Sequence, residues 1–387
     1  MNSNPLRLLV LSIEFPPGPG GLGTLAYQIS HGLTELGWQV AVATPQSHIT
    51  NQEIEAFNNR QLFEIKRFEY KGPAILEGLN RLFISLQLIR SHKPDIILAI
   101  GWQSVWLGSL MTLLTTIPCV AIGVGSEFLI LKKVKRTMAL WAYQRADLVV
   151  FISQYTRKLA QANGFHASKD TIISLGADEN IFKPELNTTD LRQQLKLGDS
   201  EVILTVGQVS ERKAQDVVIR ALPKVLEDFP SINYLIVGLP TNQARLEQLA
   251  NELGVAEYIF FTGVVPQDNL PLFYNLADVF VLVSRRTEEG EVEGFGIAVV
   301  EAALCGKPAI VSNESGLVEA VAPGMTALVV DPEQPEMTAD AIKQLLADDQ
   351  LRHEMGVAAR EHALGNATWR EQIKNFDHQL RNLIDMN

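Results

Sequence analysis

The sequence has 387 residues, of which 47% are hydrophobic and 20% are charged, and its formal net charge is −11. This length predicts two domains, and the composition is that of a globular protein. The acidic balance argues against nucleic acid as the main partner, because binding to a phosphate backbone needs a basic surface. The cysteines, Cys119 and Cys305, lie far apart in apolar segments, which predicts buried, reduced thiols in a cytoplasmic protein. No run approaches the roughly 18 apolar residues of a membrane span.

Short apolar runs alternate with amphipathic segments along the chain, which predicts βα units and parallel sheets. In the first half we expect strands at 7–13, 38–44, 62–70, 95–100, 118–124, 147–153 and 171–175, with helices such as 24–36 and 75–91 between them. A second series of strands is expected at 202–209, 233–238, 258–263, 278–284, 308–312 and 327–331. Each series is expected to form one doubly wound, Rossmann-like sheet.

These two series predict an α/β protein with a domain at 1–180, a second at 181–366 and a final helix at 367–387 that packs back towards the first domain. A Gly-Asn pair at 365–366 is expected to break the chain before that helix. Two facing Rossmann-like domains would leave a deep cleft at the carboxyl ends of both sheets. Ligands bind at these ends in open α/β sheets.

The first strand–helix junction is rich in glycine. Gly18, Gly20 and Gly23 match the G-x-G-x-x-G dinucleotide fingerprint, but the next strand is followed by no carboxylate until Glu53. The match is therefore weak evidence for NAD. Glycines at a helix start still let the backbone approach a phosphate closely. A tight turn without a ligand is the alternative.

The first junction of the second domain carries Arg212 and Lys213 just before a helix expected near Gln215. A lysine in such a loop is a point charge suited to a diphosphate. The alternative is a solvated pair of cations on a surface loop. The position of Lys213 after the leading strand favours a role in binding.

Glu293 and Glu301 lie eight positions apart, where a glycine turn leads into the apolar helix expected to begin at Gly296. The start of that helix offers free N–H groups and a positive dipole end to a phosphate. Carboxylates repel phosphate but accept hydrogen bonds from sugar hydroxyls, so this pattern points to a phosphate with a sugar on each side. A nucleotide-sugar has that form. A structural carboxylate is the alternative for Glu301, since a buried carboxylate needs a partner.

Residues 128–145 combine basic and apolar residues, and we expect one helix there. Such a helix either contacts an anionic membrane or covers the first sheet. The sequence has no D-x-D triplet, no zinc-type spacing of His and Cys, and neither the G-x-S-x-G nor the P-loop motif. We therefore expect no metal and no bound cofactor.

With these motifs in place, the chain resembles the retaining GT-B glycosyltransferases of glycosyltransferase family 4. The resemblance rests on the P-P-x-x-G-G-x-G loop, the strand segment at 146–153, the basic residue at 213 and the E-x7-E motif at Glu293 and Glu301. The segments at 212–222 and 287–302 are especially similar to bacterial mannosyltransferases that act on phosphatidylinositol lipids. Gln208 stands where many members have arginine, and Val124 stands where many have histidine.

The resemblance implies that Lys213 and Glu293 are catalytic. It implies that donor-binding residues are Gly20, Gly21, Gly23, Gln208, Arg212, Lys213, Val264, Glu293, Gly294, Phe295, Gly296, Ile297 and Glu301. Lys213 would bind the diphosphate, Glu293 the donor sugar and Glu301 the ribose, while Val264 would meet the base through backbone atoms. On the acceptor side it implies Gly125, Ser126 and Glu127.

The sequence thus predicts a metal-independent, retaining glycosyltransferase that moves a hexose from a nucleoside-diphosphate sugar to a hydroxyl. The acceptor, a lipid, a glycan or a small metabolite, stays open, as does peripheral contact with the inner membrane face through 128–145. Three alternatives remain: a nucleotide-sugar 2-epimerase of the same fold, a catalytically silent subunit that binds nucleotide-sugar, and a disfavoured NAD-dependent oxidoreductase.

Overall fold

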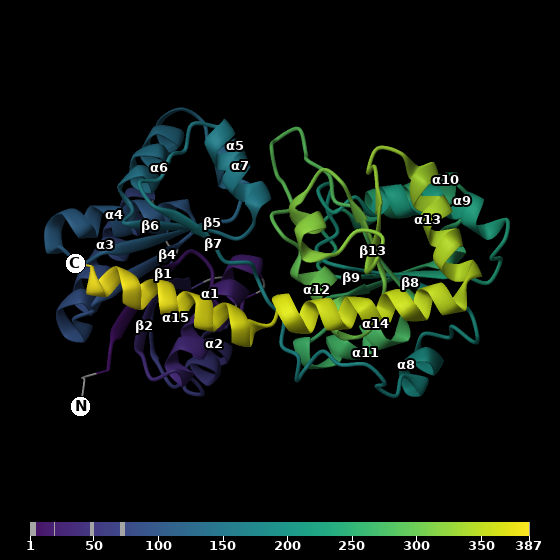
Figure 1. Ribbon diagram of the computed structural model, residues 1–387, viewed down its shortest axis with the longest axis horizontal. Coiled ribbons are helices and arrows are strands. Elements are labelled where there is room, and N and C mark those ends of the chain that lie inside the picture. The colour runs from purple at the N-terminus through teal and green to yellow at the C-terminus, as the bar shows by residue number, and fades with distance from the viewer. Residues whose placement is uncertain (1–4, 19, 47–49, 70–73, 387) are drawn as a thin grey trace. The chain divides into compact units, whose positions relative to one another are not determined.

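A computed structural model of the chain describes residues 5–18, 20–46, 50–69 and 74–386 (Figure 1). Tyr70, the expected last residue of the third strand, lies outside these ranges. The chain divides into two compact units, one made of Met1–Ser174 with Trp369–Asn387 and the other of Leu175–Thr368. The boundaries expected at 180 and 366 both fall inside the second of these units.

Within its described residues, the first unit contains a seven-stranded parallel sheet in the order β3-β2-β1-β4-β5-β6-β7. The strands are β1 Arg7–Ser12, β2 Gln39–Gln46, β3 Glu64–Glu69, β4 Ile96–Ile100, β5 Cys119–Gly123, β6 Leu148–Phe151 and β7 Asp170–Ile172. The central strands β1, β4 and β5 are apolar and buried, as expected for a sheet covered on both faces. The order reverses between β1 and β4.

Helices connect these strands: α1 Gly21–Glu35, α2 Asn51–Asn58, α3 Ala74–His92, α4 Trp102–Thr115, α5 Glu127–Ile130, α6 Lys133–Arg145 and α7 Gln154–Ala162. The last helix, α15 Trp369–Asp385, packs against α1 (Figure 1). A Cβ on Gly32 of α1 would lie 2.6 Å from Ile373, so the two helices meet closely there. Trp38 donates a hydrogen bond of 2.6 Å to Asp377.

The second unit contains a six-stranded parallel sheet in the order β10-β9-β8-β11-β12-β13, counted over its described residues. Its strands are β8 Val202–Val206, β9 Asn233–Val237, β10 Ile259–Gly263, β11 Val279–Leu282, β12 Ala309–Ser312 and β13 Ala327–Val330. The helices are α8 Thr189–Gln194, α9 Gln215–Leu226, α10 Gln243–Glu252, α11 Leu270–Leu276, α12 Ile297–Leu304, α13 Pro335–Ala347 and α14 Asp349–Asn366. Short 3₁₀ turns lie at Ala256–Tyr258, Gln267–Asn269 and Gly316–Ala320. This order reverses between β8 and β11.

Two expectations about helices were wrong. Residues 128–145 do not form one helix, because α5 ends at Ile130 and α6 begins at Lys133 after an extended residue at Lys132. The Gly-Asn pair at 365–366 does not break the chain, because α14 continues through Asn366 and the backbone departs from helical geometry at Ala367. A helix ends where its capping geometry changes, and a glycine in the last turn does not force that change.

Other expectations were confirmed. All thirteen expected strands form within their predicted segments or overlap them, apart from the undescribed residue at 70. Cys119 and Cys305 are buried and free. Among the described residues, no helix is long and apolar enough to cross a bilayer.

Candidate active site

The candidate site of the second unit lies at the carboxyl ends of β8, β11 and β12, beside the point where the strand order reverses. The loop after β8 carries Arg212 and Lys213, and the loop after β11 leads to Glu293 and into α12. The loop after β12 contributes Gly316. In open α/β sheets, ligands bind at this kind of switch point.

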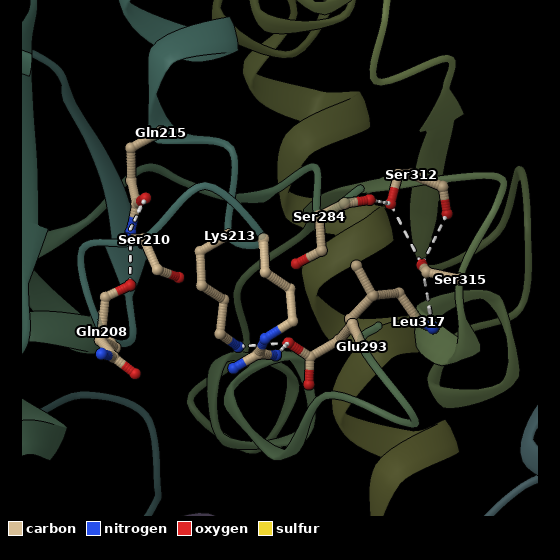
Figure 2. A network of polar contacts seen from close by, with 10 residues as sticks. Gln208, Ser210, Lys213, Gln215, Ser284, Glu293, Ser312, Ser315 and Leu317 are labelled. Atoms are coloured by element: carbon tan, nitrogen blue, oxygen red, sulfur yellow. Dashed lines mark hydrogen bonds and ion pairs between the residues drawn. The ribbon is translucent and has the colours of Figure 1, made fainter. Parts of the chain in front are cut away.

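Hydrogen bonds from a buried side chain hold the loop after β8 and thereby fix the direction of Lys213. The buried Gln215, at the start of α9, accepts from the N–H of Ser210 at 3.3 Å and donates to the carbonyl oxygen of Gln208 at 3.0 Å (Figure 2). Gly207 has a φ of +147°, and a Cβ there would lie 3.0 Å from the Lys213 side chain. Glycine at 207 therefore leaves the space through which Lys213 passes.

Three charged side chains meet in this site. Glu293 Oε2 lies 2.6 Å from Lys213 Nζ and 2.5 Å from Arg212 Nη1. The side chains of Lys213, Glu293 and Arg212 are 10%, 12% and 22% exposed. Figure 2 shows Lys213 and Glu293 pointing toward one another. One carboxylate thus pairs with two cations in a largely buried setting.

The ionisation of these groups follows from burial and from the pairs. Burial lowers the pKa of Lys213, while the charge of Glu293 opposes this change. Burial would raise the pKa of Glu293, but Lys213 and Arg212 outweigh it, and the net pKa is lowered. The carboxylate is therefore ionised at neutral pH, and its charge opposes the loss of the Lys213 proton.

Close backbone packing fixes the loop that carries Glu293. The N–H of Gly316 donates to the carbonyl oxygen of Glu293 at 2.9 Å, and a Cβ on Gly316 would lie 2.0 Å from the carbonyl oxygen of Gly294. Gly296 caps α12 with a φ of +91°, and its Cβ would meet Leu317 at 2.2 Å. Phe295 is buried, which anchors the turn.

Glu301 lies in α12, whose first residue is Ile297, and its carboxylate accepts a hydrogen bond of 2.6 Å from the buried hydroxyl of Tyr274. Burial raises its pKa to about 7, with Tyr274 and the charge of Lys213 opposing the rise. Lys213 is thus electrostatically coupled to both acids of the E-x7-E motif.

Two other residues of the expected donor site lie apart from this cluster. The exposed Gln208 donates from its side chain to Thr241 Oγ1 at 2.9 Å, and Figure 2 shows it away from Lys213 and Glu293. Val264 is 61% exposed just after β10, which is separated from β8 by β9. No contact joins either side chain to Glu293 among the described residues.

In the first unit, the glycine loop after β1 leads into α1, whose N-cap is Gly20. The Glu14 carboxylate accepts hydrogen bonds from the N–H groups of Leu22 and Gly23 at this helix start, and burial raises its pKa. A Cβ on Gly20 would lie 2.1 Å from Glu14 Oε2, whereas Gly21 faces open space. Gly23 allows close approach to Phe15, whose N would lie 3.2 Å from an added Cβ.

Glu127, expected on the acceptor side, is buried at the start of α5. It accepts from the N–H of Val124 at 2.7 Å, from the N–H of Gly125 at 2.9 Å and from the hydroxyl of Tyr143 at 3.1 Å. Burial raises its pKa against these bonds. The observed contacts hold the β5–α5 turn, and Ser126 is the N-cap of α5.

Sequence reasoning did not find Glu14, Gln215 or Tyr274. Glu14 could have been suspected from its place two residues after a strand and just before the glycines. Gln215 is the first residue of α9, but its side chain bonds to an irregular loop whose conformation the sequence does not predict. The periodicity of α11 does not distinguish Tyr274 from the other apolar residues of that helix. Among the described residues, no group of three or more His, Cys, Asp or Glu side chains is arranged to hold a metal ion.

Comparisons with known proteins agree with this architecture. Two parallel Rossmann-like units define the GT-B class of glycosyltransferases, and the fold matches sucrose-phosphate synthase of Thermosynechococcus elongatus with a TM-score of 0.83 at 21% identity, over 99% of this chain and all of the other. Anabaena HepE in complex with UDP and glucose matches with a TM-score of 0.83 at 20% identity, over 97% of this chain and all of the other.

The chain belongs to glycosyltransferase family 4. The family model described as Glycosyltransferase Family 4 matches residues 19–180, and the one described as Glycosyl transferases group 1 matches residues 187–362. A GDP-mannose-dependent alpha-(1-6)-phosphatidylinositol monomannoside mannosyltransferase of Mycobacterium tuberculosis is 30% identical over 94% of this chain and 95% of its own length. The protein of the same name in Mycolicibacterium smegmatis is 37% identical, over 58% of this chain and 59% of its own length. A D-inositol 3-phosphate glycosyltransferase of Corynebacterium diphtheriae is 27% identical over 94% of this chain and 92% of its own.

Proposed function

We propose that this protein is a retaining, metal-independent hexosyltransferase that transfers mannose from GDP-mannose to a hydroxyl of an inositol-containing acceptor. The observation that carries the proposal is the meeting of Lys213, Glu293 and the start of α12 at the switch point of the second sheet. The donor and acceptor classes are supported by the names of the relatives, which use GDP-mannose or act on inositol phosphate.

In the proposed reaction, the bond between the anomeric carbon and the diphosphate oxygen breaks, and the acceptor oxygen bonds to that carbon on the same face. The acceptor proton passes to an oxygen of the departing diphosphate. Negative charge develops on the diphosphate, and fixed positive groups that face it lower the barrier. Lys213 and the N–H groups at the start of α12 supply that charge, which is why we propose that no divalent ion is required.

The other proposed roles follow from the same arrangement. Glu293 accepts from hydroxyls of the donor sugar, and Glu301 accepts from the ribose hydroxyls. In the structure both carboxylates already have a partner within the protein: Glu293 pairs with Lys213, and Glu301 accepts a hydrogen bond from Tyr274. The glycine loop of the first unit remains a predicted phosphate contact.

A ligand panel tests the donor. A ligand that binds only the folded state raises the melting temperature, so UDP, GDP, ADP and their sugars can be ranked by thermal shift. We expect GDP and GDP-mannose to give the largest shifts. Transfer to an inositol-containing lipid, followed by product NMR, should then show the anomeric configuration of the donor retained, at an undiminished rate in EDTA.

Each competing function has its own outcome in these assays. Binding of nucleotide without transfer or hydrolysis would identify a silent subunit, and conversion of the free nucleotide-sugar would identify an epimerase. Strict dependence of transfer on magnesium or manganese would contradict the metal-independent mechanism. An inverted product would contradict the retaining one.

We also propose that a short basic segment contacts an anionic membrane. Lys132, Lys133 and Lys135 are exposed, and so are the neighbouring Ile130 and Val134 at 41% and 71%. A lysine near an anionic surface contributes about 1 kcal/mol of binding. The triple change of these lysines to Glu is expected to abolish sedimentation with phosphatidylinositol-containing vesicles, whereas Lys224→Glu on α9 is expected to leave it unchanged. Equal sedimentation of both variants would contradict the proposal.

A further inference from the structure

In the structure, the cations expected to bind the donor already hold an anion. A single oxygen, Oε2 of Glu293, lies within 2.6 Å of both Lys213 Nζ and Arg212 Nη1. A carboxylate and a phosphate are both acceptor-only anions that such donors can bind. A diphosphate placed on these two cations would therefore compete with Glu293 for them.

Arg212 is well placed to be one of the two cations that bind the diphosphate. Its backbone oxygen accepts from the N–H of Arg285 at 2.9 Å, so the β8 loop is tied to the β11 loop that leads to Glu293. Gln208, in the same loop, is neutral and donates to Thr241. Arg212 therefore supplies the positive charge beside Lys213 that pairs with Glu293.

The surroundings contain polar atoms without partners. The hydroxyls of Ser210 and Ser284 are buried and make no hydrogen bond within the described part of the chain. Ser284 is fully buried just after β11, at the same edge of the sheet, and Ser210 lies in the same loop as Lys213 (Figure 2). Buried hydroxyls normally have a partner, so these two are unused hydrogen-bonding groups in the loops that carry Lys213 and Glu293.

We propose that Glu293 is a resident counter-ion, which the diphosphate of the donor replaces on Arg212 and Lys213, and that Arg212 supplies the second cation in place of Gln208. The inference rests on the proposed function for its ligand, a nucleoside diphosphate carrying a sugar. After the exchange the Glu293 carboxylate has lost both cations, and the sugar hydroxyls of an intact donor replace them as donors.

The exchange makes the site selective for the intact donor. A nucleoside diphosphate without its sugar takes both cations and leaves a largely buried carboxylate with neither cation nor sugar, which is unfavourable. The nucleotide-sugar provides both replacements. Glu293 thus favours binding of the donor over its spent nucleotide, and it promotes release of the nucleotide after transfer.

Calorimetric titration of pyrophosphate, GDP and GDP-mannose tests the exchange. In Glu293→Gln no ion pair has to break, so pyrophosphate and GDP are expected to bind about tenfold more tightly than to the wild type. GDP-mannose is expected to gain less, so the preference for donor over nucleotide shrinks. Glu289→Gln removes the same charge from an exposed position of the same loop and is expected to bind as the wild type.

Arg212→Gln provides a second, independent measurement. It is expected to weaken pyrophosphate binding about tenfold in the Glu293→Gln background. In the wild type the effect is expected to be smaller, because Arg212→Gln also removes the Arg212–Glu293 pair that pyrophosphate would have to break. The proposal is overturned if Glu293→Gln binds pyrophosphate no more tightly than the wild type. It is also overturned if Gln208→Ala weakens binding more than Arg212→Gln does.

The outcome is separable from that of the proposed function. Tighter pyrophosphate binding in Glu293→Gln without any sugar transfer by the wild type would keep the counter-ion and reject the transferase. Transfer by the wild type with unchanged pyrophosphate affinity in Glu293→Gln would do the reverse. Circular dichroism and melting temperature establish that each variant is folded, and Arg212→Gln still tests the exchange should Glu293→Gln fail to fold.

Discussion

Lys213 interacts with the other charged side chains of the candidate active site. It lies 2.6 Å from Glu293 and interacts electrostatically with Arg212 and Glu301. A buried ammonium is tolerated only with a counter-ion. Glu293 is that counter-ion, and its charge opposes the loss of the Lys213 proton.

Lys213→Ala is expected to cut kcat/KM for transfer by at least about a hundredfold, because a preorganised charge facing the leaving group is lost. Folding stability should fall much less, since Glu293 keeps its pair with Arg212. Steady-state kinetics and chemical denaturation measure the two effects. Lys224→Ala, which removes a half-buried lysine of α9 that pairs with Asp340, serves as the control. Wild-type kinetics in Lys213→Ala would remove Lys213 from the mechanism.

Glu301 predicts a pH dependence of nucleotide binding. Its pKa is about 7, raised by burial against the hydroxyl of Tyr274 and the charge of Lys213. In the proposed role of Glu301, ribose hydroxyls donate to the ionised form, so affinity for GDP should fall as the pH is lowered through 7. Tyr274→Phe removes a donor to the carboxylate and should move the midpoint to higher pH. Titration calorimetry across pH, with 2′,3′-dideoxy-GDP as the control for phosphate ionisation, measures this. An equal pH dependence for both nucleotides would reject a ribose contact.

The same group predicts how stability depends on pH. The raised pKa means that the folded state holds the proton more tightly than the unfolded chain between pH 4.5 and about 7. The contribution is fully present below 4.5 and is lost as the pH rises through 7. Glu301→Gln should therefore unfold at higher denaturant than the wild type above pH 7, with no such gain at acidic pH. A gain that is independent of pH would contradict a raised pKa.

At the scale of single residues, sequence reasoning named Lys213 from its place between a strand and a helix, and Glu293 from the glycine turn before an apolar helix, because both are local patterns. Partners were harder to name. Tyr274 bonds Glu301 from another helix, and Arg212 meets Glu293 across two loops. Such pairs depend on tertiary packing, which periodicity does not encode. The predicted roles of Val264 and of the glycines of the first unit stay predictions.

At the scale of the elements, the turn before α12 depends on close backbone contacts at glycine, where there is no room for a side chain. In Gly316→Ala the new Cβ would meet the backbone of Gly294 at 2.0 Å, so the Glu293 loop must move. We expect about 1–3 kcal/mol of destabilisation and roughly a hundredfold slower transfer. Denaturation and kinetics measure both effects. Gly365→Ala, in open space on α14, is the control, and wild-type transfer in Gly316→Ala would show that the loop tolerates displacement.

Strands and helices were predictable where the pattern was clear, as in the unbroken apolar run of β4 or the strong helical periodicity of α15. The break between α5 and α6 was not, because Lys132 and Lys133 are ordinary helix formers whose backbone departs from the helix there. The basic residues of this stretch are also divided by the packing. Arg136 donates to the carbonyl oxygen of Asn163, whereas Lys133 and Lys135 face solvent.

For the whole molecule, alternation of apolar runs and helical segments was enough to predict two parallel sheets. It was not enough to show that the first unit is discontinuous in sequence. The helix α15 buries Trp369, Ile373, Phe376, Leu380 and Leu383, and its partner α1 lies more than three hundred residues earlier.

Deletion of residues 369–387 is expected to unfold the first unit. Each large apolar side chain that loses its burial costs about 1.5–3 kcal/mol, and five of them exceed the stability of many domains. Hydrogen exchange should show β1 and β4 unprotected while β8 and β11 remain protected. Deletion of 386–387 alone is the matched control. Full protection of β1 in the longer deletion would show that α15 is dispensable.

This return of the chain has a consequence for biosynthesis. While the ribosome is still adding residues, the α1 surface around Gly32 lacks the helix that covers it, whereas residues 175–368 form a contiguous stretch that can fold as soon as it emerges. The first unit, most of which is synthesised first, is thus the last to have all of its residues. A nascent chain stalled before residue 369 should be held by chaperones through its N-terminal half, and release should follow once α15 has left the exit tunnel.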